Sequence, residues 1–365
     1  MTPVIVAARS QMPVNEQAQP VRQETNDKGK AFIKLLTGLH FVAALIVVMH
    51  HFLHINVSGE SHGIGHLLKK LVNNFASAGF VGVSFFFVLS GFILTYTYLG
   101  RPGQVAINRR DFWIARVARV YPTYLFALAV AAVPFWRGWG GVNTVCATPR
   151  IVTALTTPVL LQAWTPCAWA WWNAPGWSLS AEAFFYLLFP LIAVPIVRLG
   201  RRQLCAVMAF TYLIHLFVLY LYMIITVDGQ QPFADHGTWW DISTYLLRTL
   251  PFDPLVRLVE FVIGVALGSL FLKGGAHLLK GGAHRRERRA RWFTSPGALS
   301  IAASIAIVAV LAVFGPLHPW AMTPTNVLLV PFFTLLIYGV AFNEEPIATF
   351  FSLPLLVLAS TRWLK

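Results

Sequence analysis

The sequence predicts an all-α protein, a polytopic transmembrane bundle of about eight spans. Three observations lead to this prediction: 57% of the residues are hydrophobic, only 12% are charged, and the mean hydropathy is +0.64. A soluble domain is about one quarter charged, so a water-soluble chain is excluded. The apolar residues also gather into runs of about 17 to 25, the length that a helix needs to cross the hydrocarbon core.

Eight such runs follow one another along the chain. They are residues 33–52, 75–99, 120–136, 180–197, 204–227, 255–272, 296–317 and 326–342. Two shorter runs, 151–164 and 347–360, are interrupted by Pro158 and Pro354, so they are predicted to be interfacial or partly inserted. The polar residues 1–30 are predicted to be a disordered cytoplasmic tail, and residues 31–365 one transmembrane domain.

Basic residues set the predicted orientation. The net charge is +14, and most of the 28 lysines and arginines lie in the tail, in every second loop and at the C-terminal end. Because cytoplasmic loops collect lysine and arginine, the N-terminus is predicted to be cytoplasmic. This distribution explains the positive charge without a nucleic-acid partner; membrane lipids are the expected surroundings. Cys146 and Cys167 share one outer loop, where a disulfide and two free thiols remain alternatives.

Ionisable residues in or beside the spans are candidate functional residues, because charge is costly there. His40 and His51 are eleven residues apart, which puts them on one helix face about 16 Å apart. Glu182 begins the fourth span; it can orient a histidine that acts as a general base, or it can pair with an arginine. The sequence leaves both roles open.

Two further pairs of charged residues lie three positions apart in or near the spans. Arg116 and Arg119, three residues apart before the third span, suit either a phosphate clamp or a positive-inside anchor. Arg257 and Glu260 are also three apart, and a local ion pair is the simpler account. No nucleotide-binding glycine loop and no zinc-binding spacing of His and Cys occurs, so no metal is predicted.

Four blocks of sequence, in this order, resemble the landmarks of the membrane acyltransferase 3 family. They are residues 36–52 with the two histidines, the block V-G-V-S-F-F-F-V-L-S-G-F at 81–92, F-W-x-x-R-x-x-R-V-Y-P at 112–122, and W-S-L-S-x-E at 177–182. The family's members are O-acyltransferases of the bacterial cytoplasmic membrane. They use acetyl-CoA or another acyl-CoA to modify hydroxyl groups of polysaccharides, peptidoglycan, lipids or secreted small molecules.

The resemblance implies roles for particular residues. The family's essential histidine corresponds to His51, its acidic residue to Glu182, and its R-x-x-R motif, which we expect to bind CoA, to Arg116 and Arg119. The family's basic residue before the histidine is replaced here by His40. Ser90, Ser178, Trp177 and Tyr121 are candidates for contacting the substrate or the oxyanion. Family members usually have further spans, so a short C-terminus is expected.

The predicted mechanism separates two sites across the bilayer. Arginines at the cytoplasmic face would hold the CoA phosphates, whereas His51 and Glu182 at the outer face would activate an extracytoplasmic hydroxyl. Two alternatives remain. The first is a proton-coupled transporter that uses the same His and Glu. The second is an acyltransferase paralogue impaired by His40 and by the short C-terminus.

Overall fold

The computed structural model describes residues 38–51, 63–100, 107–137, 149–166, 168, 172–227, 249–280, 296–314 and 322–342. These residues form helices and connections without a strand, which confirms the all-α prediction. The first helix is Gly38–His51. The elements that follow are α2 Ile64–Ser77, η1 Ala78–Phe80, α3 Val81–Leu99, α4 Arg109–Arg137, α5 Arg150–Thr156, η2 Gln162–Trp164, η4 Ala174–Gly176, α6 Trp177–Arg198, α7 Arg201–Val227, η5 Leu250–Phe252, α9 Pro254–Lys280, α10 Pro296–Phe314 and α11 Met322–Phe342.

The contacts divide the chain into two compact units. The larger, Val42–Asn343, contains every element from α2 to α11, and the fold described below is that of this unit. The smaller consists of Met1–Phe41 and Glu344–Lys365, of which residues 38–41 are described. The predicted tail at 1–30 and the short run at 347–360 lie outside the described residues.

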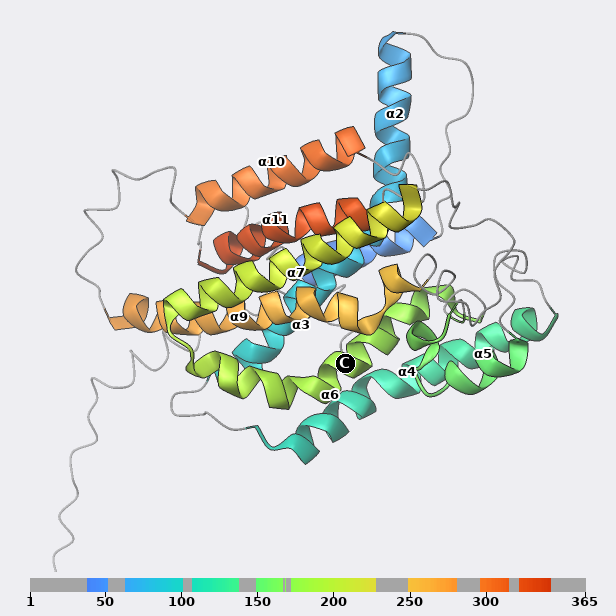
Figure 1. Ribbon diagram of the computed structural model, residues 1–365, viewed down its shortest axis with the longest axis horizontal. Coiled ribbons are helices and arrows are strands. Elements are labelled where there is room, and N and C mark those ends of the chain that lie inside the picture. The colour runs from blue at the N-terminus through green and yellow to red at the C-terminus, as the bar shows by residue number, and fades with distance from the viewer. Residues whose placement is uncertain are drawn as a thin grey trace, which may run out of the picture. The chain divides into compact units, whose positions relative to one another are not determined.

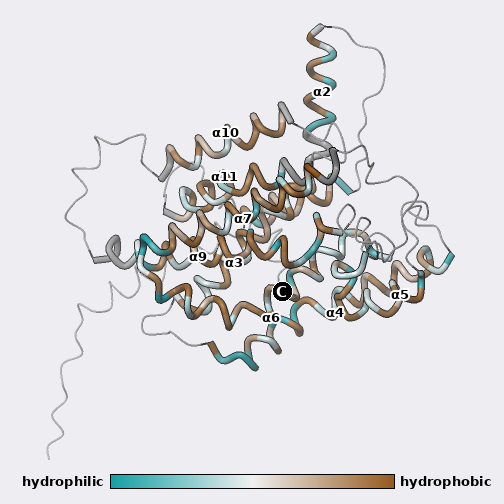
Figure 2. The backbone as a smooth tube through the Cα atoms, viewed as in Figure 1, coloured by the Kyte–Doolittle hydropathy of each residue, from teal (hydrophilic) through white to brown (hydrophobic). Residues whose placement is uncertain are grey.

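Each of the eight predicted spans corresponds to an apolar helix. Among the described residues, five helices are long and apolar enough to cross a membrane: Val81–Leu99, Arg109–Arg137, Ala174–Arg198, Arg201–Ile224 and Leu250–Gly274. Three shorter apolar helices, Gly38–His51, Ala298–Ala312 and Thr325–Ala341, account for the others. The chain is therefore a multi-pass membrane protein, and Figure 2 shows α10 and most of α3, α9 and α11 in the brown of hydrophobic residues.

Helices α3 and α9 form the centre of the bundle, where they lie side by side (Figure 1). Their apolar windows are 67% and 61% buried, compared with 11% in α4. Glycines permit this approach: a Cβ at Gly264 would overlap the carbonyl of Val88, and a Cβ at Gly91 would overlap that of Phe261. With Gly268 one turn on, α9 presents the G-x-x-x-G spacing that brings membrane helices together. The two helices run parallel.

Aromatic packing attaches α6 to this pair. The ring of Phe185 stacks on Phe261 of α9 with centroids 4.9 Å apart, and it meets Phe87 of α3 edge-on at 5.0 Å. Phe189, one turn further along α6, contacts Phe261 at 6.1 Å. Tyr98, further along α3, contacts Phe189 at 6.3 Å, so the contacts of α3 and α6 advance in the same direction. Since α9 is parallel to α3, the three helices are parallel and begin at the same end.

Helix α4 lies antiparallel to α6. Phe112 stacks on Phe189 at 5.2 Å, and the indole N–H of Trp113 donates to the carbonyl of Tyr186 at 3.1 Å. The helix begins at Arg109, whereas the apolar run predicted a span from residue 120, so the predicted start was eleven residues late. The early turns are polar, teal in Figure 2, but they are helical because Phe112 and Trp113 pack on α6.

The connection between α5 and α6 is fastened to the middle of α4. The hydroxyl of Tyr124 donates to the carbonyl of Thr157 at 2.6 Å and accepts from Nε2 of Gln162 at 3.0 Å. Gln162 also donates to the carbonyl of Gly176, just before α6. The segment 151–164, predicted to be interfacial, is thus the short helix α5 and a 3-10 turn that pack on α4.

Helix α2 was not predicted, because its residues alternate between polar and apolar groups in a run too short to span. In Figure 1 it stands across the direction of its neighbours. Asn74 near its end donates to the carbonyl of Ala312 in α10 at 2.8 Å. The helix is amphipathic, which is typical of a segment that lies along a membrane surface.

Candidate functional site

Glu182 is the centre of a polar cluster between α3, α4 and α6. Its carboxylate accepts hydrogen bonds from the hydroxyl of Tyr186, one turn along α6, and from that of Ser90 in α3 at 3.5 Å. Arg116 and Arg119 of α4 lie near enough to attract it electrostatically. Glu182 thus lies among two hydroxyl donors and within the electrostatic reach of two arginines.

Three aromatic rings lie around the guanidinium of Arg116. Its Nη2 donates to the hydroxyl of Tyr98 at 3.0 Å, and its guanidinium carbon lies 5.5 to 5.8 Å from the ring centroids of Tyr98, Phe112 and Tyr186. Aromatic faces attract a guanidinium, most strongly where water is excluded. Its Nε has no hydrogen-bond partner among the described residues. Arg116 is thus held in place by one hydrogen bond and three aromatic rings, and its Nε is a buried donor without a partner among the described residues.

A pocket of about 330 Å³ opens beside this cluster. Its wall is formed by side chains of α4, α6 and the turn after α5: Trp113, Arg116, Val117, Val120, Tyr121, Leu160, Leu179, Glu182, Ala183, Tyr186 and Leu187. Most of these side chains are apolar, so the charged groups of Arg116 and Glu182 occupy one part of an otherwise hydrophobic pocket wall. In the described part of the chain, no three His, Cys, Asp or Glu side chains gather as metal ligands would.

Leu160 enters the pocket wall from a strained backbone position. Its φ is 60°, the left-handed region that a leucine rarely adopts. Hydrogen bonds hold it there: the Ser180 hydroxyl donates to its carbonyl at 2.5 Å, and the Tyr121 hydroxyl donates to the carbonyl of Pro158 at 2.8 Å. Such strain persists only where the surrounding contacts compensate for it.

The arginines and Glu182 were predicted at opposite faces of the membrane, and that separation is wrong. Because α4 begins at Arg109, Arg116 and Arg119 lie seven and ten residues inside the helix and not before it. The antiparallel packing then brings them level with Glu182, which is five residues into α6. The two charge types form one cluster.

His51 lies away from this cluster, at the end of the first helix. It is exposed, and its neighbour His50 packs against Gly79 and Phe80 at the start of α3. Gly79 and Ser90 are eleven residues apart, about 16 Å along a helix. Nδ1 of His51 is 2.8 Å from the carbonyl of Val47. A carbonyl oxygen can only accept, so Nδ1 is the donor in this hydrogen bond, and in the neutral ring with this tautomer Nε2 is the acceptor nitrogen.

Comparison with known proteins identifies the family. The acyltransferase 3 profile, described as an acyltransferase domain, matches residues 33–361, which is most of the chain. The chain belongs to the acyltransferase 3 family. All the landmark blocks found in the sequence lie inside the matched region, so this resemblance is confirmed. No solved structure matches the chain.

Three curated relatives of this acyltransferase family member are named transferases. It is 28% identical over 254 residues to Acyltransferase MdmB of Streptomyces mycarofaciens, covering 66% of this chain and 57% of that protein. The O-acetyltransferase OatA of Staphylococcus aureus is 25% identical over 201 residues, 50% of this chain and 31% of OatA. The putative peptidoglycan O-acetyltransferase YrhL of Bacillus subtilis is 27% identical over 198 residues, 49% and 26% of the two chains. The chain thus spans little more than half of MdmB and less than a third of the others.

The remaining predicted site residues of this family member lie in different places. Tyr121 lines the pocket, but its hydroxyl is engaged by Pro158. Ser178 donates to the carbonyl of Pro175, and Trp177 packs under the guanidinium of Arg257. His40 belongs to the smaller unit, not to the one that holds the arginines. Cys146 and Cys167 lie outside the described residues.

Sequence reasoning missed three members of the cluster: Tyr98, Trp113 and Tyr186. Tyr186 had a visible signal, since it follows Glu182 by four residues and so shares its helix face. Trp113 lies inside the landmark block at 112–122, but the sequence pattern assigns it no role of its own. Tyr98 had no local signal, because it meets Arg116 only after α3 and α4 pack around α6.

Proposed function

We propose that this chain is an integral-membrane O-acyltransferase that moves an acyl group, in the first instance acetyl, from acyl-CoA to a hydroxyl outside the cytoplasm. The acceptor would be a cell-surface carbohydrate, a lipid or a secreted small molecule. Family membership and the names of the relatives support acyl transfer. The observation that carries the proposal is the cluster of Arg116, Arg119 and Glu182 beside a pocket of about 330 Å³ within an apolar bundle.

The arginines suit the anionic part of the donor. A guanidinium recognises phosphate oxygens through several N–H donors, and Arg116 lines the pocket with its Nε not yet hydrogen-bonded. Glu182 would offset one of the two positive charges when the site is empty and hold Arg116 in orientation through Tyr186. The apolar wall suits the less polar arm that follows the phosphates. His40 is a further proposed contact for the donor, by its place in the family pattern.

His51 is the proposed general base. Its Nε2 would take the proton of the acceptor hydroxyl while that oxygen forms a bond to the thioester carbonyl carbon. The carbon–sulfur bond then breaks, and the departing thiolate takes the proton back from the imidazolium. The carbonyl of Val47, which accepts from Nδ1, would do the orienting that a carboxylate does in a catalytic triad. His51 lies outside the arginine cluster, so the proposal requires a donor with a long arm between its phosphates and its thioester, and acyl-CoA has one.

The proposed location is the bacterial cytoplasmic membrane, with the N-terminus in the cytoplasm. The distribution of arginine and lysine among the loops supports this orientation. In it α6 begins at the outer side and α4 at the cytoplasmic side, so the cluster, five residues into α6 and seven to ten residues into α4, lies within the helical bundle.

The experiment is acetyl transfer from radiolabelled acetyl-CoA in membranes that contain wild type or variants. His51→Ala is expected to lower the rate by about 100-fold or more, the usual contribution of a general base. The matched control is His66→Ala, another exposed histidine, on α2. Arg116→Gln is expected to raise the KM for acetyl-CoA, and Arg202→Gln, an exposed arginine at the start of α7, is its control.

Undiminished transfer by His51→Ala would contradict the assignment of the base. If Arg116→Gln and Arg202→Gln had the same KM for acetyl-CoA, the donor site would have to lie elsewhere. Proton-coupled uptake that Glu182→Gln abolishes, without any need for CoA, would replace acyl transfer by transport.

A further inference from the structure

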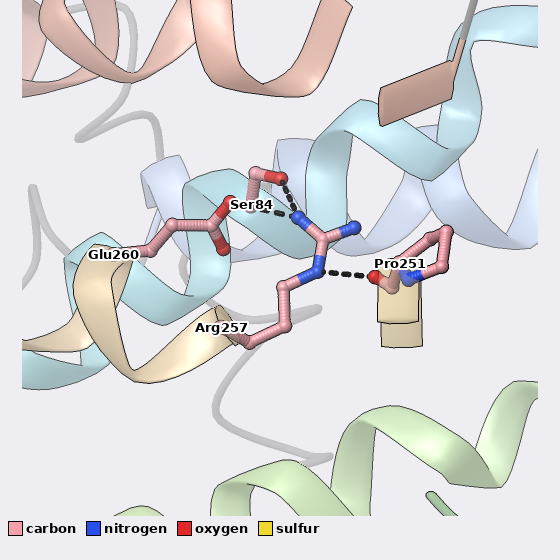
Figure 3. Close-up of polar contacts among 4 residues, drawn as sticks. All are labelled: Ser84, Pro251, Arg257 and Glu260. Carbon is pink, nitrogen blue, oxygen red and sulfur yellow. Dashed lines mark hydrogen bonds and ion pairs between the residues drawn. The ribbon is translucent and has the colours of Figure 1, made fainter. Parts of the chain in front are cut away.

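Arg257 and Glu260 of α9 form a buried ion pair with an additional set of partners. Nη1 of Arg257 lies 2.8 Å from a carboxylate oxygen of Glu260, as the spacing of three predicted. The same Nη1 donates to the hydroxyl of Ser84 at 3.2 Å, and Nε donates to the carbonyl of Pro251 at 2.8 Å. Figure 3 shows the guanidinium between these groups, which come from α3, α9 and the turn η5 before α9.

Burial makes this pair an unusual choice for stability alone. The side chains of Arg257 and Glu260 are 6% and 0% exposed. Taking two charges out of water costs about as much as their attraction returns, so apolar replacements of a buried pair are often neutral or stabilising. Electrostatic attraction between Arg257 and Glu260 therefore does not by itself explain why a charged pair is buried here. The contacts of Arg257 with other elements indicate its role.

Arg257 also touches the first residue of α6. Its guanidinium carbon lies 5.6 Å from the ring centroid of Trp177. That ring is held edge-on by Phe252 at 5.0 Å and by Phe87 at 6.1 Å. Because α3, α6 and α9 are parallel and begin at the same end, one side chain joins the first turns of all three helices.

The same two helices, α3 and α6, meet again at the candidate site. Glu182 follows Trp177 by five residues, about 7.5 Å along α6, and Ser90 follows Ser84 by six, about 9 Å along α3. Ser90 donates to Glu182 at 3.5 Å. Arg257 and this hydrogen bond are therefore two ties between the same helices, one or two turns apart, and α9 contributes no residue to the pocket wall.

We propose that Arg257, charge-balanced by Glu260, is a positioning residue: it sets the register of α6 against α3 and thereby aims the Glu182 carboxylate at Arg116 and Arg119. Its consequence for the rate of acyl transfer rests on the proposed function, whereas its effect on helix register does not. Among the described residues, the hydrogen-bond and ring partners of Arg257 are Pro251, Ser84, Glu260 and Trp177, and none of them lines the pocket.

The experiment measures register and transfer separately. In a background in which Cys146, Cys167 and Cys205 are serine, the pair Ser90→Cys and Glu182→Cys reports the approach of α3 to α6 through its rate of oxidative cross-linking. Arg257→Met alone leaves Glu260 buried without its counter-ion, so the informative variant is Arg257→Met with Glu260→Met. We expect this double variant to fold and its cross-linking rate to fall about fivefold or more.

A second arm measures acetyl transfer in chains that retain Ser90 and Glu182. The same double variant is expected to lose about tenfold or more in kcat. Arg257→Lys is expected to remain impaired, because a single ammonium nitrogen lacks the planar fork whose Nε reaches Pro251 while Nη1 reaches Ser84 and Glu260. Ser269→Ala is the control, since that buried serine of α9 donates only to the carbonyl of Val265 in its own helix.

An unchanged cross-linking rate in the folded double variant would overturn the proposal, as would an equal fall in Ser269→Ala. Reduced cross-linking with a normal rate of transfer would uphold the positioning of α6 and count instead against the proposed function of the Glu182 cluster. Full rescue of cross-linking by Arg257→Lys would overturn the part of the proposal that requires a guanidinium.

Discussion

A single methyl group added at Gly264 is expected to destabilise the central pair of helices. An alanine in place of a helical glycine normally stabilises a helix by about 0.5–1 kcal/mol. At Gly264 the new Cβ would overlap the carbonyl of Val88, a backbone group that cannot rotate away. Overpacking costs about 1–3 kcal/mol, and a backbone collision belongs in the upper half of that range. The net loss is therefore about 1–2.5 kcal/mol.

Two other glycines provide a graded comparison. A Cβ at Gly268 would lie 2.9 Å from Cβ of Thr95, about 0.5 Å inside ordinary contact, so Gly268→Ala should cost less. A Cβ at the exposed Gly200 would meet only the end of the Gln203 side chain at 3.4 Å, so Gly200→Ala should cost nothing. The expected order of destabilisation is Gly264, then Gly268, then Gly200.

The assay is thermal unfolding of the detergent-solubilised protein. A loss of 1 kcal/mol lowers the Tm of a chain of 150–250 residues by about 2–4 °C and that of a longer chain by less, so Gly264→Ala should melt a few degrees below wild type. If Gly264→Ala melted at or above the Tm of Gly200→Ala, the close approach of α3 and α9 through backbone contact would be refuted.

Two further predictions concern α4 and the orientation of the bundle. Tyr124→Phe removes a hydroxyl that both donates to Thr157 and accepts from Gln162, so it should cost about 1–3 kcal/mol, more than the about 0.5–1.5 kcal/mol for Tyr121→Phe, which loses one bond. Chemical denaturation of the two variants compares them, and equal losses would contradict the network. For the orientation, Ala174→Cys and Gly200→Cys lie at opposite ends of α6 at exposed positions. In a cysteine-free background, an impermeant thiol reagent should label the first from outside intact cells and the second only in inverted vesicles; labelling of both from one side would exclude a membrane-spanning α6.

Local patterns carried most of the fold prediction because a membrane helix is defined by composition over its own length. The eight apolar runs correspond to eight helices, and the i, i+3 spacing correctly paired Arg257 with Glu260. The beginning of α4 was missed for the same reason. Hydropathy identifies hydrophobic segments, whereas α4 begins further upstream, in a polar turn where Phe112 and Trp113 pack against α6.

The prediction that Arg116 and Glu182 lie at opposite membrane faces was wrong because the start of α4 was misplaced. The predicted span began at residue 120 and left Arg116 before it, on a helical turn at the cytoplasmic face. The helix begins at Arg109 and brings Arg116 close to Glu182. Tyr98 and Ser90 joined the cluster for a further reason that no single-chain pattern contains, namely the parallel alignment of α3 with α6.

The sequence by itself determined that this is a helical membrane protein with an excess of positive charge in alternate loops, and its landmark blocks identified the acyltransferase 3 family. Only the tertiary structure decided which charges meet: Glu182 with two arginines, His51 apart from them, and Arg257 at the junction of three helices. The physical reason is that helix formation depends on neighbours in the chain, whereas the contacts of a charged side chain depend on the register between helices.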